Sequence, residues 1–480
     1  MDEKRHRVSE DDRNDSEDEF RDMLRQFLSG NGSFDPQQLA GAAGLPGDSA
    51  SIQALMSQLQ SALRSSGDGI NWDVALEQGT AIASKDAVES TPAERAALDQ
   101  AFNVAALWLD EVTSISELTS TPVLLSRRQW LKDTMPVWTQ LAEPVATSIS
   151  DALTQVMHDQ APEEMQGMLQ NAGHIVRAVG GTLFAMQLGQ VVGQLSAEVV
   201  SGGDVGIPLL KDGTAALLPQ NVAAFGEGLD ISADQVALYL AVRELAHARL
   251  FRHAKWLRLQ LITSITEFAR GVTIDTDRMQ ELAESFDPSN PEELRQAMVS
   301  GALIPPKTEA QEAALGRLET LLALIEGWVD VVTAKATARL PKSDAVAETV
   351  RRRRAAGGPA ESAFGTLVGL ELRPRRLREA AAMWKQVTDA VGDDARDDLW
   401  SHPDLLPTSE DVDDPTALVA RLTASASGVE PEYDELDEAI AALLRGDAIE
   451  GDAPREPGDD DPSSDGDAST SGGDDGPRPV

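Results

Sequence analysis

One segment, residues 236–251, constrains the fold most, because it is apolar nearly all round and yet carries two arginines, a glutamate and a histidine. Ser232 and, three residues later, Gln235 form a capping-box pattern, so we expect a helix to begin there. A helix that is apolar on every side is buried inside a protein. Buried charges are unfavourable unless they are paired or bind a metal. The segment therefore predicts a core helix whose charged side chains have partners elsewhere in the chain.

Three of these four residues, Arg243, Glu244 and His247, form the pattern Arg-Glu-x-x-His, and the fourth is Arg249. In the related pattern His-Glu-x-x-His, two histidines on one helix face bind zinc and the glutamate acts as general base. Arginine stays protonated in proteins, so Arg243 is excluded as a metal ligand. Glu244 remains a candidate catalytic base and His247 a candidate ligand. The same five residues also arise by chance, and such a cluster can be an ion network that holds helices together.

Three later residues are candidates for a further ligand. His253 lies six residues after His247, as in an extended three-histidine motif, but Leu250 stands where that motif has a helix-ending glycine. If the helix continues, six residues turn His253 about 240° away from His247. Glu267 has the sequence separation of a glutamate ligand on a following helix, and Glu326 lies in a more apolar setting. His158, His174 or His402 could also complete the ligand set, but the sequence does not place them.

The composition excludes several classes of site. The chain has no cysteine, which rules out disulfides, thiolate metal ligands and cysteine nucleophiles. Its net charge of -39 disfavours binding to nucleic acid and to anionic membranes, and it suits a soluble protein whose partner, if any, is a peptide or another protein. The first residues are charged and lack the apolar run of a targeting segment, so we expect a cytoplasmic protein.

Residues 178–200 are the stretch that most resembles a membrane span. Glutamines recur along one helical face there, so the run is not uniformly apolar. Gly189 and Gly193 form a GxxxG pair, which allows two helices to approach closely. We interpret the segment as a helix packed against another helix in a protein without membrane spans.

The chain is expected to be mainly α-helical. We predict a disordered acidic N-terminus at 1–17, a helical segment at 18–69, a helical domain at 70–445 and a disordered acidic tail at 446–480. Within the domain, Asp-Gly between two short apolar runs at 205–218 predicts a β-hairpin just before the central helix. Thr308 and Gln311 resemble another helix cap.

Five stretches of the sequence resemble a family of bacterial zincin-like hydrolases described as zinc-dependent metallopeptidase-like. The stretches are Tyr239–Phe251, Trp256–Leu257, Glu267–Gly271, Leu324–Trp328 and Trp400–Pro407. The resemblance covers residues from about 100 to 420. It implies a zincin-like helical domain, a bound zinc ion and hydrolysis of peptide bonds by an activated water.

Carried onto this sequence, the resemblance implies that Glu244 is the base, His247 a zinc ligand and Glu326 the downstream ligand. Arg243 stands where the family pattern has its first histidine. Two hypotheses follow. The chain is a zinc-dependent hydrolase with an altered metal motif, or it is an inactive binding or scaffold protein. In the second case, an ion pair of Arg243 with Glu326 or Glu244 replaces the metal.

Overall fold

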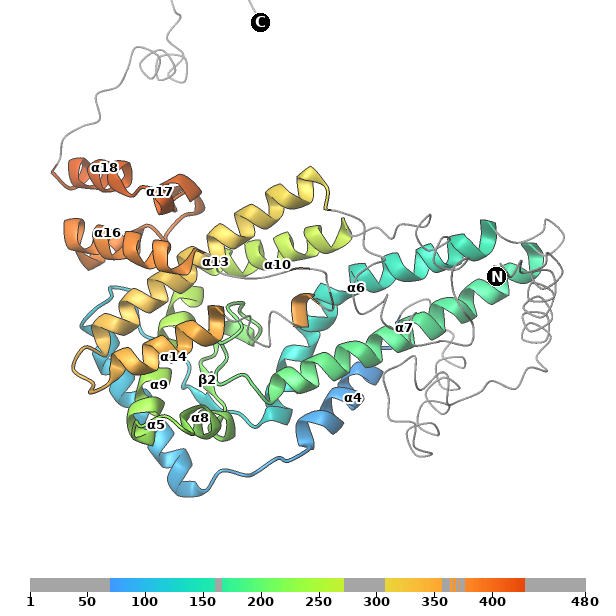
Figure 1. Ribbon diagram of the computed structural model, residues 1–480, viewed down its shortest axis with the longest axis horizontal. Helices are drawn as coiled ribbons and strands as arrows, with labels where there is room; N and C mark the ends of the chain where they lie inside the picture. The colour runs from blue at the N-terminus through green and yellow to red at the C-terminus, as the bar shows by residue number, and fades with distance from the viewer. Residues whose placement is uncertain are drawn as a thin grey trace, which may run out of the picture. The chain divides into compact units, whose positions relative to one another are not determined.

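Helices make up most of the residues that the structure describes, as the apolar periodicity predicts (Figure 1). The computed structural model describes residues 70–159, 166–271, 307–355, 363–365, 367, 370 and 376–427. Its elements in chain order are α4 (Asp73–Ser84), α5 (Pro92–Asp110), β1 (Val123–Leu124), α6 (Arg127–Asp159), α7 (Gln166–Ser196), η2 (Lys211–Gly213), β2 (Ala216–Leu217), α8 (Pro219–Gly226), α9 (Ala233–His253), α10 (Lys255–Arg270), α13 (Glu309–Ala336), α14 (Ser343–Ala355), α16 (Leu377–Asp398), η3 (Pro403–Leu405), α17 (Ser409–Asp413) and α18 (Thr416–Ala426).

The predicted terminal segments 1–17, 18–69 and 446–480 lie outside the described residues. The domain limits that we drew at 70 and 445 therefore stay predictions.

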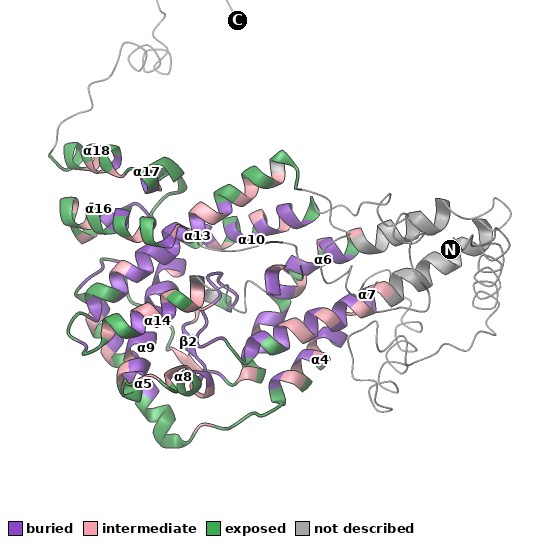
Figure 2. Ribbon diagram, in the orientation of Figure 1, coloured by how far each residue is buried: buried purple, intermediate pink, exposed green. Residues whose placement is uncertain are grey.

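The central helix predicted from residues 236–251 is α9. It runs from Ala233 to His253, and almost every residue from Val236 to Phe251 is buried, as Figure 2 shows. Ser232 is the N-cap residue, as expected, but its side chain makes no capping hydrogen bond, so the predicted capping box is wrong. The box predicted at Thr308 and Gln311 is present at the start of α13. Burial on all sides, rather than capping, therefore accounts for the position of α9.

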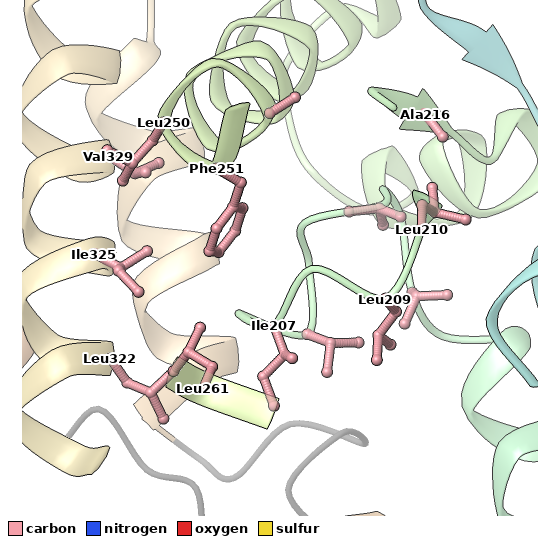
Figure 3. Close-up of a cluster of buried hydrophobic side chains, with 14 of the residues drawn as sticks. Ile207, Leu209, Leu210, Ala216, Leu250, Phe251, Leu261, Leu322, Ile325 and Val329 are labelled. Atoms are coloured by element: carbon pink, nitrogen blue, oxygen red, sulfur yellow. The ribbon is translucent and has the colours of Figure 1, made fainter. Parts of the chain in front are cut away.

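Helix α9 is enclosed by α5, α8, α10, α13 and α14, which all pack against it. Figure 3 shows one part of this core, where Leu250 and Phe251 of α9 face Ile325 and Val329 of α13. Ile207 and its apolar neighbours in the segment before β2 lie on the other side of the same cluster. The core thus brings together three parts of the chain that are far apart in sequence: the segment before β2, α9 and α13.

The β-hairpin predicted at 205–218 is wrong. β2 instead pairs in parallel with β1, and its Leu217 forms a single antiparallel bridge with Ser201 on the other side. The Asp-Gly pair lies in the short 3₁₀ helix η2, where Gly213 has a φ of 63°. The local apolar runs could not reveal this pairing, because the partner strand β1 lies far earlier in the chain and spans only two residues. The pairing of β2 with β1 and with Ser201 holds the segment from Ser201 to Leu217 close to α9.

Close helix packing at the GxxxG pair is confirmed. Helix α7 packs against α4, and a Cβ atom placed on Gly189 would lie 2.4 Å from the carbonyl oxygen of Ala75. A Cβ on Gly193 would lie 2.9 Å from Ile82. Among the described residues, no helix has the length and apolar character needed to cross a membrane.

A buried carboxylate links the C-terminal helices to the core. Asp397, at the end of α16, accepts hydrogen bonds from the hydroxyl of Thr113 (2.6 Å) and from the indole N–H of Trp328 (2.9 Å). It also pairs with Arg396 at 2.7 Å. These contacts join α13 and α16 to the turn that follows α5.

Candidate functional site: a buried ion-pair cluster

Arg243, Glu244 and His247 lie in the interior of the protein, as the apolar surroundings predict. Their exposed fractions are 6%, 1% and 1%, and Glu326 of α13 is 0% exposed. Arg243 and His247 are four residues apart on α9, so their side chains lie on the same face one turn apart. This face is directed at α13.

Glu326 is the centre of the cluster. Arg243 forms an ion pair with its Oε2 through Nη2. Nε2 of His247 lies 3.1 Å from its Oε1, and Nη2 of Arg354, on α14, lies 3.0 Å from the same oxygen. Helices α9 and α14 therefore place two guanidinium groups and one imidazole on a single buried carboxylate of α13.

The sequence reasoning missed Arg354. It lies in the run Arg351–Arg354, which resembles a solvated helix face. The structure separates the members of this run by helical position, because Arg352 is exposed whereas Arg354 is directed into the cluster. The apolar residues Val346, Ala347 and Val350 of the same helix mark its buried side, and they could have indicated that Arg354 lies on that side.

Electrostatics keep Glu326 ionised. Burial alone would raise the pKa of its carboxyl, but Arg354, His247 and Arg243 outweigh burial and hold that pKa well below its usual range. Burial lowers the pKa of His247, and the two guanidinium groups lower it further, although Glu326 opposes them. The imidazole is therefore neutral near pH 7 and carries one N–H.

The neutral imidazole of His247 has acceptors on both sides. Its Nδ1 lies 3.1 Å from the carbonyl oxygen of Arg243, and its Nε2 lies 3.1 Å from Glu326. A single N–H can satisfy one of these, and the ionised carboxylate is the stronger acceptor. We assign the proton to Nε2, so that His247 donates to Glu326.

Glu244 is directed away from this cluster, toward the segment between α7 and β2. Its Oε2 accepts from the backbone N–H of Gly203 and its Oε1 from that of Ala216, both at 2.8 Å. Burial raises the pKa of the Glu244 carboxyl to about 7, although these two hydrogen bonds lower it in part. A Cβ on Gly202 would lie 2.8 Å from Oε1 of Glu244, so only glycine allows the backbone this close.

The other candidate ligands lie elsewhere. His253 is the last residue of α9, which continues through Leu250, and it is exposed. Glu267 is exposed on α10. His402 is exposed before η3, where it accepts a hydrogen bond from the backbone of Asp404. The side chains of His158 and His174 lie outside the described part of the chain.

These residues do not fit a zinc ion. Structural and catalytic zinc sites use at least three protein ligands, and the cluster brings together two groups of the right kind, His247 and Glu326. Both are already engaged, and two guanidinium groups at the same carboxylate would repel a dication. Within the described ranges, no group of three or more histidine, cysteine, aspartate or glutamate residues is arranged to hold a metal ion.

A small pocket opens beside the cluster. Arg243, Arg353 and Arg354 line it together with Ser201 and Asp204. The space between its atoms is about 330 Å³, including the part that is open to solvent. Arg353 pairs with Asp204 at 3.0 Å, so this second ion pair lies at the pocket wall.

Comparison with known proteins assigns the family. The model of a family described as zincin-like metallopeptidase matches residues 70–419, and the chain belongs to that family. No curated protein matches the chain. A solved structure from Chloroflexus aurantiacus, described as a candidate hydrolase with a novel fold, has a TM-score of 0.50 and 19% sequence identity. The match covers 74% of this chain and 98% of that one, and it shows a shared fold.

Proposed function

We propose that this protein is a metal-independent member of the zincin-like metallopeptidase family that acts by binding a partner rather than by zinc-dependent hydrolysis. The observation that carries the proposal is the ion pair of Arg243 with Glu326. The arginine replaces the first histidine of the motif, and its fixed charge is matched by the carboxylate that the resemblance assigned to zinc. The same positions that would hold a metal therefore form a neutralised helix contact.

Hydrolysis is the rival function. It is favoured by the family match and by the pKa of Glu244, about 7, which suits a general base at neutral pH. The surroundings of Glu244 disfavour it. Both carboxylate oxygens accept backbone hydrogen bonds from Gly203 and Ala216, and the residue is 1% exposed. A base held in this way positions the chain segment around it instead of meeting a substrate.

The partner proposed for the binding function is a peptide or protein. A net charge of -39 opposes association with nucleic acid and with anionic lipid. Cationic or neutral protein surfaces meet no such barrier. A cytoplasmic location remains part of the proposal.

The test combines metal content with hydrolysis. Protein purified without chelator is analysed for zinc, and wild type and Glu244→Gln are assayed on a mixture of unstructured peptides. We expect well under one zinc per chain and no cleavage that depends on Glu244. Stoichiometric zinc that is lost in His247→Ala, or cleavage abolished by Glu244→Gln, would overturn the proposal.

A further inference from the structure

The pocket beside the cluster is positively charged in a protein that is otherwise strongly acidic. Three guanidinium groups line it, from Arg243, Arg353 and Arg354. The carboxylates that contact these groups are those of Glu326 and Asp204. Three positive and two negative charges leave one positive charge uncompensated, and in a partly buried setting such a charge is costly. An anion in the pocket would balance it.

One donor at this place has no acceptor. The Nε–H of Arg354 is buried and has no hydrogen-bond partner among the described residues. Nη2 of the same guanidinium is already used, because it contacts Glu326 and donates to the backbone oxygen of Asp204 at 2.8 Å. A guanidinium presents its donors as a planar fork, which matches the two oxygens of a carboxylate.

The size of the pocket limits what enters. The space between its atoms is about 330 Å³, and this volume includes the part that is open to solvent, so the enclosed part is smaller. The rest of the wall includes the apolar side chains of Phe225, Leu240 and Val350. The pocket thus fits the charged end of a ligand with a short apolar neighbour, rather than a whole molecule.

From these observations we propose that the pocket lined by Arg243, Arg353 and Arg354 binds a carboxylate group. A singly charged, planar carboxylate matches one uncompensated positive charge and a guanidinium fork, whereas a phosphate carries more negative charge than the pocket balances. The carboxylate comes from the C-terminus of a peptide or from a small organic acid. This inference rests on the proposed binding function, for which it names the ligand chemistry.

The experiment measures binding to the full-length protein by calorimetry at constant ionic strength. The probes are acetyl-trialanine with a free C-terminus, the same peptide with a C-terminal amide, sodium acetate and inorganic phosphate. We expect the free-acid peptide to bind and the amide not to. Saturable binding of acetate with an affinity equal to that of the peptide would identify a small acid as the ligand, which also supports the proposal.

Two matched variants locate the site. Arg353→Gln removes a pocket guanidinium, and Arg352→Gln removes the neighbouring one, which is exposed and pairs with Glu348. Loss of a charged hydrogen bond predicts at least about tenfold weaker binding in Arg353→Gln, with little change in Arg352→Gln. Thermal midpoints of both variants confirm that they fold.

Equal binding of acid and amide, tighter binding of phosphate, or equal weakening by both variants would overturn the carboxylate site. The zinc analysis is separate from these measurements. A zinc-free protein that binds no carboxylate refutes this inference alone, whereas stoichiometric zinc refutes the proposed function.

Discussion

The guanidinium of Arg243 and the carboxylate of Glu326 form a buried ion pair between α9 and α13. The pair is not isolated, because Arg354 and His247 contact the same carboxylate. Arg243 is therefore one of three side chains that hold the buried Glu326 carboxylate in place.

Removal of Arg243 alone should destabilise the protein strongly. Arg243→Met leaves the buried Glu326 carboxylate with fewer partners, and breaking a buried pair costs about 3–5 kcal/mol. Because Arg354 still pairs with Glu326, we expect the loss in the free energy of unfolding to lie near the lower end of this range. The double variant Arg243→Met, Glu326→Gln should lose less than the sum of the single variants. Urea denaturation measures all three, and additivity within about 0.5 kcal/mol would show that the pair is not coupled.

Rebuilding the motif should not by itself restore a metal site. Arg243→His supplies the missing histidine, but Arg354 still holds Glu326. We expect Arg243→His, Arg354→Gln to bind zinc at least about tenfold more tightly than Arg243→His, since groups around metal ligands change affinity by about 10–100-fold. Competition with a chromogenic chelator measures both affinities. Equal affinities would mean that Arg354 does not control the carboxylate.

Sequence reasoning reached the cluster because burial and charge are both visible in the local pattern. Arg243 and Glu326 each lie in an apolar helix, and a buried charge requires a partner. Their pairing therefore follows from the sequence as a hypothesis. Arg354 was missed because its run of arginines resembles a solvated face, and the burial of one member depends on how α14 packs.

The environment of Glu244 could not be derived in the same way. Its partners are the backbone N–H groups of Gly203 and Ala216. Because nearly every residue has such a group, the sequence does not show which ones bind Glu244. The parallel pairing of β1 with β2, which places that segment, joins strands too short to show a period. The family resemblance indicated the fold but carried no information on these contacts.

Glu244→Gln should remove part of the pH dependence of the free energy of unfolding. Burial raises the pKa of Glu244 from 4.5 to about 7, so between these values the folded state holds a proton that the unfolded state has released. The free energy of unfolding therefore falls as the pH rises through this window, by up to about 3 kcal/mol. The variant lacks this fall.

The measurement for Glu244 is urea denaturation of both proteins between pH 4.5 and pH 8. The depressed pKa of Glu326 acts in the opposite direction, because its contribution is lost as the pH falls below its usual range. It is present in wild type and variant alike and cancels in the difference. Parallel stability curves for the two proteins would contradict the assigned pKa.

Tyr239→Phe should be nearly neutral for stability. Tyr239 is 1% exposed, and its hydroxyl has no hydrogen-bond partner within the described residues. Burial raises its pKa to about 12, so no charge is lost on substitution. We expect a change within about 0.5 kcal/mol. The control Thr113→Val removes a buried hydroxyl that does donate, to Asp397 at 2.6 Å, and should cost about 1–3 kcal/mol. Thermal unfolding measures the stability of both variants, and equal losses of stability in Tyr239→Phe and Thr113→Val would contradict this prediction.

Gly203→Ala should destabilise the protein through its close approach to α9. A Cβ at this position would lie 2.9 Å from Cβ and Cγ of His247 and 3.1 Å from Oε2 of Glu244. Both neighbours are held by other contacts, so the backbone must shift, at a cost of about 1–3 kcal/mol. In the control Gly316→Ala, on exposed α13 surface, the added Cβ meets nothing within 4 Å and should stabilise the helix by about 0.5–1 kcal/mol. Urea denaturation gives both values, and a Gly203→Ala variant as stable as wild type would show that the segment does not pack tightly on the motif helix.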